Sequence, residues 1–322
     1  MMRSLRIFGH GHLSGHREGR SITPIDGPKL LVKRQWRLGD VVMCEPACRA
    51  LARLGTVIFS TRDEYHPVVN FFSGRPPRTM SYPPPSDPRI VVADEIFDLD
   101  TVTLDHPGFE TKVDAFVSAC GMDPTSMPRD ERVPIIEPGQ QYQAWAKMKL
   151  ESLRILDRSI IAVVRQSYDP SSPRSLPPAI IDAIADRLSR EHHIVYVGVT
   201  PVRVGASRSI HNLTGCTPDV TFAAGLIMQC RLLLTVDTGL MHVAGAMGVP
   251  MVTIMGPTRP DDLATVYDRT SVLDVGPECS PCYDRGCESP CLHRIDPEEI
   301  YRLCLSRISS PNAPTEVHRA AS

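Results

Sequence analysis

Short runs of apolar and β-branched residues recur along the chain, and each is followed by a polar turn and by a segment with helical apolar spacing. The clearest run, 232–236, is continuous rather than alternating, which predicts a strand buried on both faces of a parallel sheet. The segment after it is rich in alanine and glycine, so we expect a helix that packs closely on that sheet. Residues 249–254 form the next apolar run. This pattern predicts a strand–helix–strand unit.

The turn between this strand and its helix is Asp237-Thr238-Gly239. It lies where open α/β sheets bind ligands, at the carboxyl end of a strand. The unpaired N–H groups and the positive dipole end of the following helix favour an anion there. We therefore expect a ligand that carries phosphate.

A similar unit opens the ordered part of the chain. Residues 29–33 and 56–60 predict strands, and 41–54 has helical apolar spacing. Pro46 lies past the first turn of that helix, so a kink or a late helix start is expected there. Asp40 suits the N-cap of the helix. A carboxylate at the rim of a cleft between domains can instead act as a general base, and both roles stay open on this evidence.

The α/β pattern restarts in the second half, with apolar runs at 159–164 and 193–197 and helical spacing at 177–188 and 219–229. Two such units in tandem predict an α/β fold with two Rossmann-like domains that face a central cleft. That cleft is the default ligand site.

The domain limits follow from these patterns and from proline-rich stretches. Residues 75–89 are dense in proline, which predicts a surface loop without regular structure. We expect a flexible N-terminal extension at 1–27, an N-terminal domain at 28–150, a C-terminal domain at 151–308 and a flexible tail at 309–322.

Composition and charge exclude several classes of protein. The 322 residues suit two domains of ordinary size, and a net charge of −2 gives no reason to expect nucleic acid as a partner. No apolar run approaches the roughly 20 residues that span a bilayer. The first 27 residues lack the apolar core of a secretory signal, so we expect a cytoplasmic location.

Four of the ten cysteines fall close together, at Cys279, Cys282, Cys287 and Cys291. In a cytoplasmic chain this clustering indicates metal ligation before disulfides. Four thiolates suit a tetrahedral structural zinc or iron. Reduced cysteines without metal, or a disulfide pair, remain the alternatives.

Three motifs in a fixed order carry a family resemblance. They are Arg37-Leu-Gly-Asp40-Val-Val, Pro173-Arg-Ser-Leu-Pro177, and Val236-Asp-Thr-Gly-Leu-Met-His-Val-Ala-Gly-Ala-Met-Gly-Val-Pro250 followed by Ile254-Met-Gly-Pro-Thr-Arg-Pro260. Together they resemble glycosyltransferase family 9, the bacterial heptosyltransferase-type enzymes of the GT-B fold, over roughly residues 29 to 305.

The resemblance implies a function. Family members transfer a sugar from a nucleotide diphosphate sugar, with inversion at the anomeric carbon and without a catalytic cofactor. For this chain it implies heptose or a related sugar, with ADP-heptose as the first donor to consider. The acceptor is lipopolysaccharide core, another glycan, a lipid-linked glycan or a protein. Peripheral contact with the cytoplasmic face of the inner membrane fits such acceptors.

The resemblance also assigns roles to residues. Asp40 matches the family's proposed base, and Arg174 matches the basic residue that contacts the diphosphate. Pro218, with Thr217 beside it, falls near the position that lines the nucleobase. Some family members carry a similar four-cysteine knuckle, and iron is bound in a related branch. The donor-binding turn of the family is matched by Asp237, Thr238, Gly239 and His242.

Two positions depart from the family pattern. Leu176 stands where an aromatic residue usually precedes the proline, and the loop 198–203 lacks the acidic residue that often binds the donor. A paralogue that binds nucleotide sugar without turnover is therefore the alternative to an active transferase. An NAD-dependent oxidoreductase is disfavoured, because no Gly-x-Gly-x-x-Gly follows the first strand.

Overall fold

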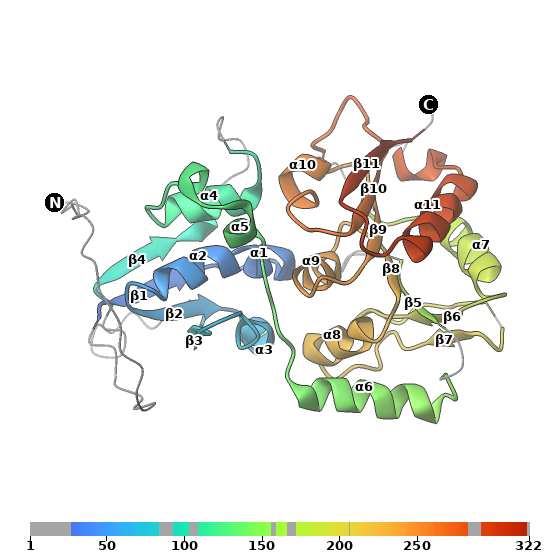
Figure 1. Ribbon diagram of the computed structural model, residues 1–322, viewed down its shortest axis with the longest axis horizontal. Coiled ribbons are helices and arrows are strands. Elements are labelled where there is room, and N and C mark those ends of the chain that lie inside the picture. The colour runs from blue at the N-terminus through green and yellow to red at the C-terminus, as the bar shows by residue number, and fades with distance from the viewer. Residues whose placement is uncertain are drawn as a thin grey trace.

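The structure is a computed structural model that describes residues 27–83, 93–102, 109–155, 159–165, 172–205, 207–282 and 291–320. It contains two parallel sheets with helices around them, one in each half of the molecule (Figure 1). The predicted α/β class is confirmed. The extension predicted at 1–27 lies, except for Gly27, outside the described residues. The helices are α1 (Leu38–Met43), α2 (Glu45–Leu51), α3 (His66–Val69), α4 (Lys112–Ala119), α5 (Arg129–Arg132), α6 (Gln140–Ser152), α7 (Pro178–Leu188), α8 (Val220–Met228), α9 (Gly239–Ala246), α10 (Pro260–Leu263) and α11 (Pro297–Ser309).

The N-terminal sheet has the order β3-β2-β1-β4, with every pair parallel. The chain moves outward from β1 to β3 and then returns to place β4 on the other side of β1. The order therefore reverses between β1 and β4, and ligands bind at the carboxyl ends of strands at such a switch point. The strands are β1 (Lys29–Lys33), β2 (Thr56–Thr61), β3 (Arg78–Ser81) and β4 (Glu95–Asp98).

The C-terminal sheet has the order β11-β10-β9-β8-β5-β6-β7, again entirely parallel. Its switch point lies between β5 and β8, two strands whose residues are all buried. This burial on both faces agrees with their continuous apolar sequences. The strands are β5 (Ile160–Val164), β6 (His193–Tyr196), β7 (Ile210–Asn212), β8 (Leu232–Val236), β9 (Met251–Met255), β10 (Thr270–Asp274) and β11 (Glu316–Arg319).

The C-terminal end of the chain corrects one prediction. Within 309–322, expected to be a flexible tail, β11 pairs in register with β10 and forms the edge of the sheet. The buried Arg307 donates to the carbonyl oxygens of Ala313 and Pro314, at 2.6 and 3.2 Å. These hydrogen bonds position the segment that leads into β11. Arg319 then pairs with Asp274 on the neighbouring strand at 3.1 Å.

The domain boundary differs from the expected limit at residue 150, which falls inside α6. This helix packs against α8 of the C-terminal domain, and a chain of edge-to-face aromatic rings joins the two. Tyr142 and Trp145 of α6 both contact Phe222 of α8, with centroids 5.1 and 4.9 Å apart. Tyr142 also meets Phe71 of the N-terminal domain at 5.1 Å. Helix α6 therefore belongs with the C-terminal domain.

Proline acts locally in two ways. The break expected near Pro46 is confirmed, because α1 ends at Met43 and α2 starts at Glu45 with the proline in its first turn. The proline-dense segment 75–89 is not irregular throughout. Strand β3 forms in it at a proline-free stretch and pairs with the outer side of β2.

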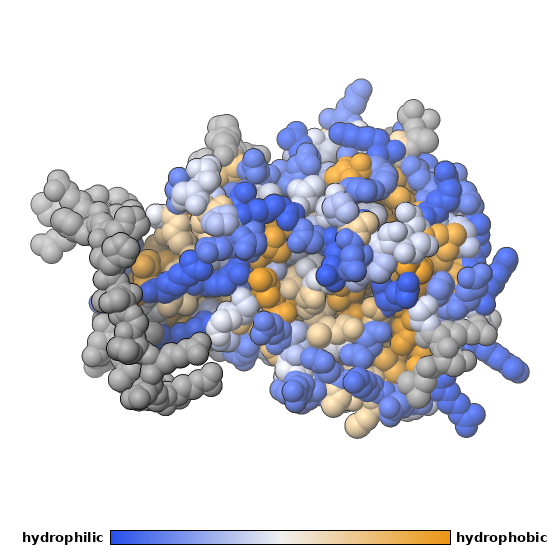
Figure 2. Space-filling view, in the orientation of Figure 1, coloured by the Kyte–Doolittle hydropathy of each residue, from blue (hydrophilic) through white to orange (hydrophobic). Residues whose placement is uncertain are grey.

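The hydropathy of the helices and of the surface bears on whether the molecule spans a membrane. Within the described residues, no helix is both long enough and apolar enough to cross a membrane. On the face shown in Figure 2, hydrophilic residues predominate and hydrophobic residues occur in small, separate patches.

Helices α6 and α8 approach so closely that Gly225 has no room for a side chain. A Cβ built there lies 2.5 Å from the carbonyl oxygen of Tyr142. We predict that Gly225→Ala lowers the free energy of unfolding by about 1–3 kcal/mol, because the clash with backbone outweighs the better helix propensity of alanine. Chemical denaturation measures this.

Gly198→Ala is the matched control, since its built Cβ has only a methyl group at 3.9 Å. It should leave stability within about 0.5 kcal/mol of the wild type. A Gly225→Ala protein as stable as this control would show that the helices have room to separate.

Candidate functional site

Asp40 lies at the switch point of the N-terminal sheet, on the helix that follows β1. It is buried, and the predicted N-cap role is wrong, because Arg37 occupies the N-cap and Asp40 lies inside α1. Its carboxylate instead pairs with two cations. Arg34, at the end of β1, contacts Oδ2, and Lys112, at the start of α4, places Nζ 2.7 Å from Oδ1.

The two cations decide the charge of Asp40. Burial by itself raises the pKa of this carboxyl, but Lys112 and Arg34 oppose it and bring the pKa below its usual value. The ring of Phe116 lies beneath both cations, 5.3 Å from the Arg34 guanidinium and 5.8 Å from the Lys112 ammonium. Asp40 is therefore an ionised carboxylate at neutral pH.

Asp237 and Arg174 meet at the switch point of the C-terminal sheet. Asp237 follows β8 and is buried, and Arg174 lies on the connection that follows β5. Arg174 Nη1 is 3.2 Å from Asp237 Oδ2, and the Thr258 hydroxyl donates to the same carboxylate oxygen at 2.9 Å. Arg174 is mostly buried, so it is not a solvated loop arginine.

The turn after Asp237 opens helix α9 as the sequence predicted. Thr238 is the N-cap, and its hydroxyl oxygen accepts from the Met241 N–H at 3.4 Å. His242, in the first turn, is buried, and its Nδ1 lies 2.9 Å from the Tyr267 hydroxyl. Burial lowers the pKa of His242 to about 4, although Asp237 and Asp40 act in the opposite direction. His242 is therefore neutral at pH 7.

Helices α1 and α9 bring the two switch points together. A Cβ built on Gly39 lies 2.3 Å from Cδ2 of His242, and one built on Gly239 lies 2.7 Å from Cβ of Leu38. Each helix thus presents a glycine to the other. Asp40 follows Gly39 directly, so the carboxylate of one domain lies beside the donor-type turn of the other.

Pro218, the remaining predicted donor contact, lies on a different connection of the C-terminal sheet from Asp237. Pro218 is exposed just before α8, on the connection that follows β7. The loop 198–203 is joined to this connection, because Val202 N–H donates to the Thr214 hydroxyl at 3.0 Å. Leu176, at the position of the family's aromatic residue, is buried in the C-terminal core. It therefore presents no ring to a ligand.

Two cysteines of the cluster, Cys282 and Cys291, lie beside the turn that follows β9. Cys282 N–H donates to the Pro257 carbonyl at 2.6 Å, and the Cys291 sulfur lies 2.6 Å from a Cβ built on Gly256. Cys287 lies outside the described residues. Among the residues that are described, no three His, Cys, Asp or Glu side chains are grouped to hold a metal ion.

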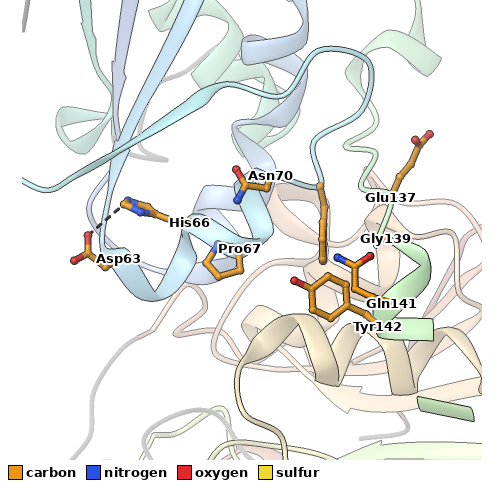
Figure 3. Close-up of a pocket in the computed structure, with 9 residues that line it drawn as sticks. Asp63, His66, Pro67, Asn70, Glu137, Gly139, Gln141 and Tyr142 are labelled. Carbon is orange, nitrogen blue, oxygen red and sulfur yellow. Dashed lines mark ion pairs between the residues drawn. The ribbon is translucent and has the colours of Figure 1, made fainter. Parts of the chain in front are cut away.

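A separate cavity of about 490 Å³ opens where the domains join (Figure 3). Asp63, His66 and Asn70 line it from the N-terminal domain, and Gln141 and Tyr142 line it from the start of α6. None of the predicted site residues belongs to this lining. The candidate site is therefore defined by the α1–α9 contact and not by this cavity.

Arg34 and Lys112 were missed from the sequence. Arg34 directly follows the apolar strand β1, and this position was the available signal. Lys112 gave no such signal. It lies near Asp40 because β4, which precedes it in the chain, pairs with β1.

Comparisons with known proteins agree with the motifs. Residues 204–293 match the sequence profile of glycosyltransferase family 9 (heptosyltransferase). Lipopolysaccharide heptosyltransferase 2 of Escherichia coli K12 is 46% identical over 62 residues, which are 19% of this chain and 18% of that protein. Lipopolysaccharide heptosyltransferase 1 of Pseudomonas aeruginosa is 31% identical over 99 residues, 29% of this chain and 28% of that protein. The sequence matches therefore span less than a third of these relatives.

Solved structures extend the likeness to most of the chain. The ADP-heptose lipopolysaccharide heptosyltransferase II of E. coli has a TM-score of 0.69 at 16% identity, covering 89% of this chain and 100% of that one. A family 9 glycosyltransferase from Veillonella parvula has a TM-score of 0.67 at 16% identity, covering 89% of this chain and 99% of that one. The iron-containing dodecameric glycosyltransferase TibC of enterotoxigenic E. coli has a TM-score of 0.59 at 13% identity, covering 91% of this chain and 78% of that one. The predicted GT-B fold and the resemblance to family 9 are confirmed.

The pairing of Lys112 with Asp40 should make stability depend on pH in a defined direction. A carboxyl whose pKa is lowered by folding stabilises the fold above its unfolded pKa, and this stabilisation is lost as the pH falls through the folded pKa. We predict that Lys112→Met costs about 1–3 kcal/mol at pH 7. The difference from the wild type should shrink as the pH falls below the ordinary carboxyl pKa of about 4 and through the lower pKa of folded Asp40, where this carboxylate takes up its proton.

Urea denaturation at a series of pH values measures this difference. Lys33→Met is the control, because Lys33 pairs with the exposed Asp98 and a surface pair contributes only about 0–1 kcal/mol. A Lys112→Met effect that stayed constant from pH 7 to pH 3 would argue against an ionised Asp40.

Proposed function

We propose that this chain, a heptosyltransferase-like protein of glycosyltransferase family 9, transfers a sugar from a nucleotide diphosphate sugar to an acceptor hydroxyl with inversion at the anomeric carbon. The observation that carries the proposal is the α1–α9 contact. It places an ionised carboxylate of the N-terminal domain beside the Arg174–Asp237 pair of the C-terminal domain.

Asp40 is the proposed base. It accepts the proton of the acceptor hydroxyl as the hydroxyl oxygen attacks the anomeric carbon from the face opposite the diphosphate. The bond from the anomeric carbon to the diphosphate oxygen breaks, and the nucleoside diphosphate leaves with the electron pair. Lys112 and Arg34 hold the carboxylate ionised and in place before the acceptor arrives.

Arg174 is proposed to stabilise the departing diphosphate without a metal ion. Asp237 accepts a hydrogen bond from Nη1 of Arg174 and so orients this guanidinium, which has five N–H donors in total. The Thr238 hydroxyl and the Gly239 N–H face the same anion from the start of α9. His242, being neutral, would act there as an N–H donor or as a wall of the site rather than as a cation. Pro218 is proposed to line the nucleobase.

The substrates follow from the relatives. ADP-heptose is the first donor to test, because one solved relative bears it in its name. Lipopolysaccharide core is the first acceptor, with another glycan, a lipid-linked glycan or a protein as the alternatives. We propose action in the cytoplasm, with peripheral contact at the inner membrane.

The cysteines at 279, 282, 287 and 291 are proposed to hold one structural zinc or iron. Cys282 and Cys291 both lie beside the Gly256–Pro257 turn, which suits a closed loop around an ion. Four thiolates leave no open position, so the metal would support the turn after β9 and take no part in transfer.

Substitution of the two central residues tests the transfer proposal. Asp40→Asn should lower kcat by about 100-fold or more while donor affinity stays within about twofold, because only the base is lost. Arg174→Met should instead weaken nucleoside diphosphate binding by about tenfold or more, since a charge-assisted phosphate contact contributes about 1.5–3 kcal/mol. Transfer by mass spectrometry and binding by calorimetry separate these effects.

Arg187→Met on α7 serves as the matched control, because Arg187 pairs with Glu298 far from the site and should leave both values unchanged. Full transfer by both Asp40→Asn and Arg174→Met would reject the assigned roles. Donor binding without transfer to any acceptor extract would identify the chain as the binding-only paralogue.

The metal proposal has its own test, elemental analysis of the purified protein. We expect about one zinc or iron per chain, lost in Cys282→Ser and kept in Cys120→Ser, whose cysteine is buried in the N-terminal core. Wild-type protein that folds fully without either metal would rule the site out.

A further inference from the structure

One of the two tryptophans lies at the surface beside the candidate site. Trp36 is 51% exposed, whereas Trp145 packs against Phe222. Large aromatic side chains are usually mostly buried, so an indole exposed to this extent points to a contact that the chain alone does not make.

The loop that carries Trp36 is held on both sides. Arg34 donates to the Leu99 carbonyl at 2.7 Å, and the Gln35 N–H donates to Asp100 Oδ1 at 2.8 Å. Arg37 then forms the N-cap of α1, the helix that carries Asp40. Trp36 is thus fixed at the rim of the site, directly before the helix of the proposed base.

A second strand fixes the indole ring itself. Arg62 follows β2, the neighbour of β1, and its guanidinium lies 4.3 Å from the Trp36 ring centroid. Glu64 in turn pairs with Arg62 Nε at 3.0 Å. The stacked arginine covers one part of the ring and orients it. Both residues come from the carboxyl ends of adjacent parallel strands, the edge at which Asp40 also lies.

We propose that Trp36 is the stacking platform for a sugar ring of the acceptor, oriented so that the reacting hydroxyl reaches Asp40. This rests on the proposed function, in which the C-terminal domain holds the donor and the acceptor must therefore lie on the N-terminal side. The C–H face of a pyranose packs on an indole, while its hydroxyl groups remain available to polar neighbours. The residues on either side of Trp36, Gln35 and Arg37, are polar and can hydrogen-bond to the hydroxyl groups of such a ligand.

Three variants test the platform in transfer assays with deacylated lipopolysaccharide core oligosaccharide as the acceptor. Trp36→Ala should raise the acceptor KM by about tenfold, since aromatic stacking adds to the area buried. Trp36→Phe keeps a ring and should stay within about threefold. The KM for ADP-heptose should not change in either variant. Trp145→Phe is the matched control and should leave both KM values unchanged.

A fluorescence titration tests the same contact without turnover. In a Trp145→Phe background Trp36 is the sole tryptophan, and the core oligosaccharide should change its emission saturably. Such a change in a protein that transfers no sugar would support the saccharide contact while refuting the proposed function. Wild-type transfer with an unchanged acceptor KM in Trp36→Ala would overturn the platform and leave the function standing. No change of emission at saturating oligosaccharide would also overturn it.

Discussion

Helices α1 and α9 meet so closely that neither Gly39 nor Gly239 can carry a side chain. A Cβ at Gly39 would overlap the ring of His242, and one at Gly239 would overlap Leu38. This contact fixes how the two parallel sheets face each other at their switch points. Without it, Asp40 and the Arg174–Asp237 pair would be two separate polar sites, each on its own domain.

In each half of the site, the charge state and the partners of the polar groups are fixed before any ligand binds. Asp40 is ionised because two cations outweigh its burial, and Asp237 has Arg174 and the Thr258 hydroxyl as partners. His242 stays neutral between them because burial dominates its pKa. The positions of these groups are set by packing, so they need little reorganisation when charge moves from an acceptor hydroxyl to a leaving diphosphate.

Much of this arrangement could be predicted from the sequence, because it depends on local pattern. The continuous apolar runs identified β1, β5 and β8, and the Asp237-Thr238-Gly239 turn was expected at the start of a helix, where α9 begins. Strand β11 was missed because it pairs with β10, which is distant in sequence, so no local pattern shows the pairing.

The parts of the site that could not be predicted from the sequence also depend on contacts between residues that are distant in sequence. Asp40 was expected either to cap a helix or to act as a base. It does not cap because α1 already begins at Leu38, and its carboxylate pairs instead with Arg34 and Lys112. Lys112 meets Asp40 because β4 returns beside β1, a strand order that no local pattern encodes. The boundary near residue 150 was displaced because α6 has few buried positions, and its attachment to α8 depends on aromatic contacts across the two helices.

We infer that one site is formed across the α1–α9 contact, and a crystal structure with a bound nucleoside diphosphate tests this most directly. We expect the diphosphate within hydrogen-bond distance of the Arg174 guanidinium and of the N–H groups at the start of α9, with its terminal phosphate toward Asp40. A nucleotide bound instead in the cavity lined by Asn70 and Tyr142, with the α1–α9 region empty, would contradict it.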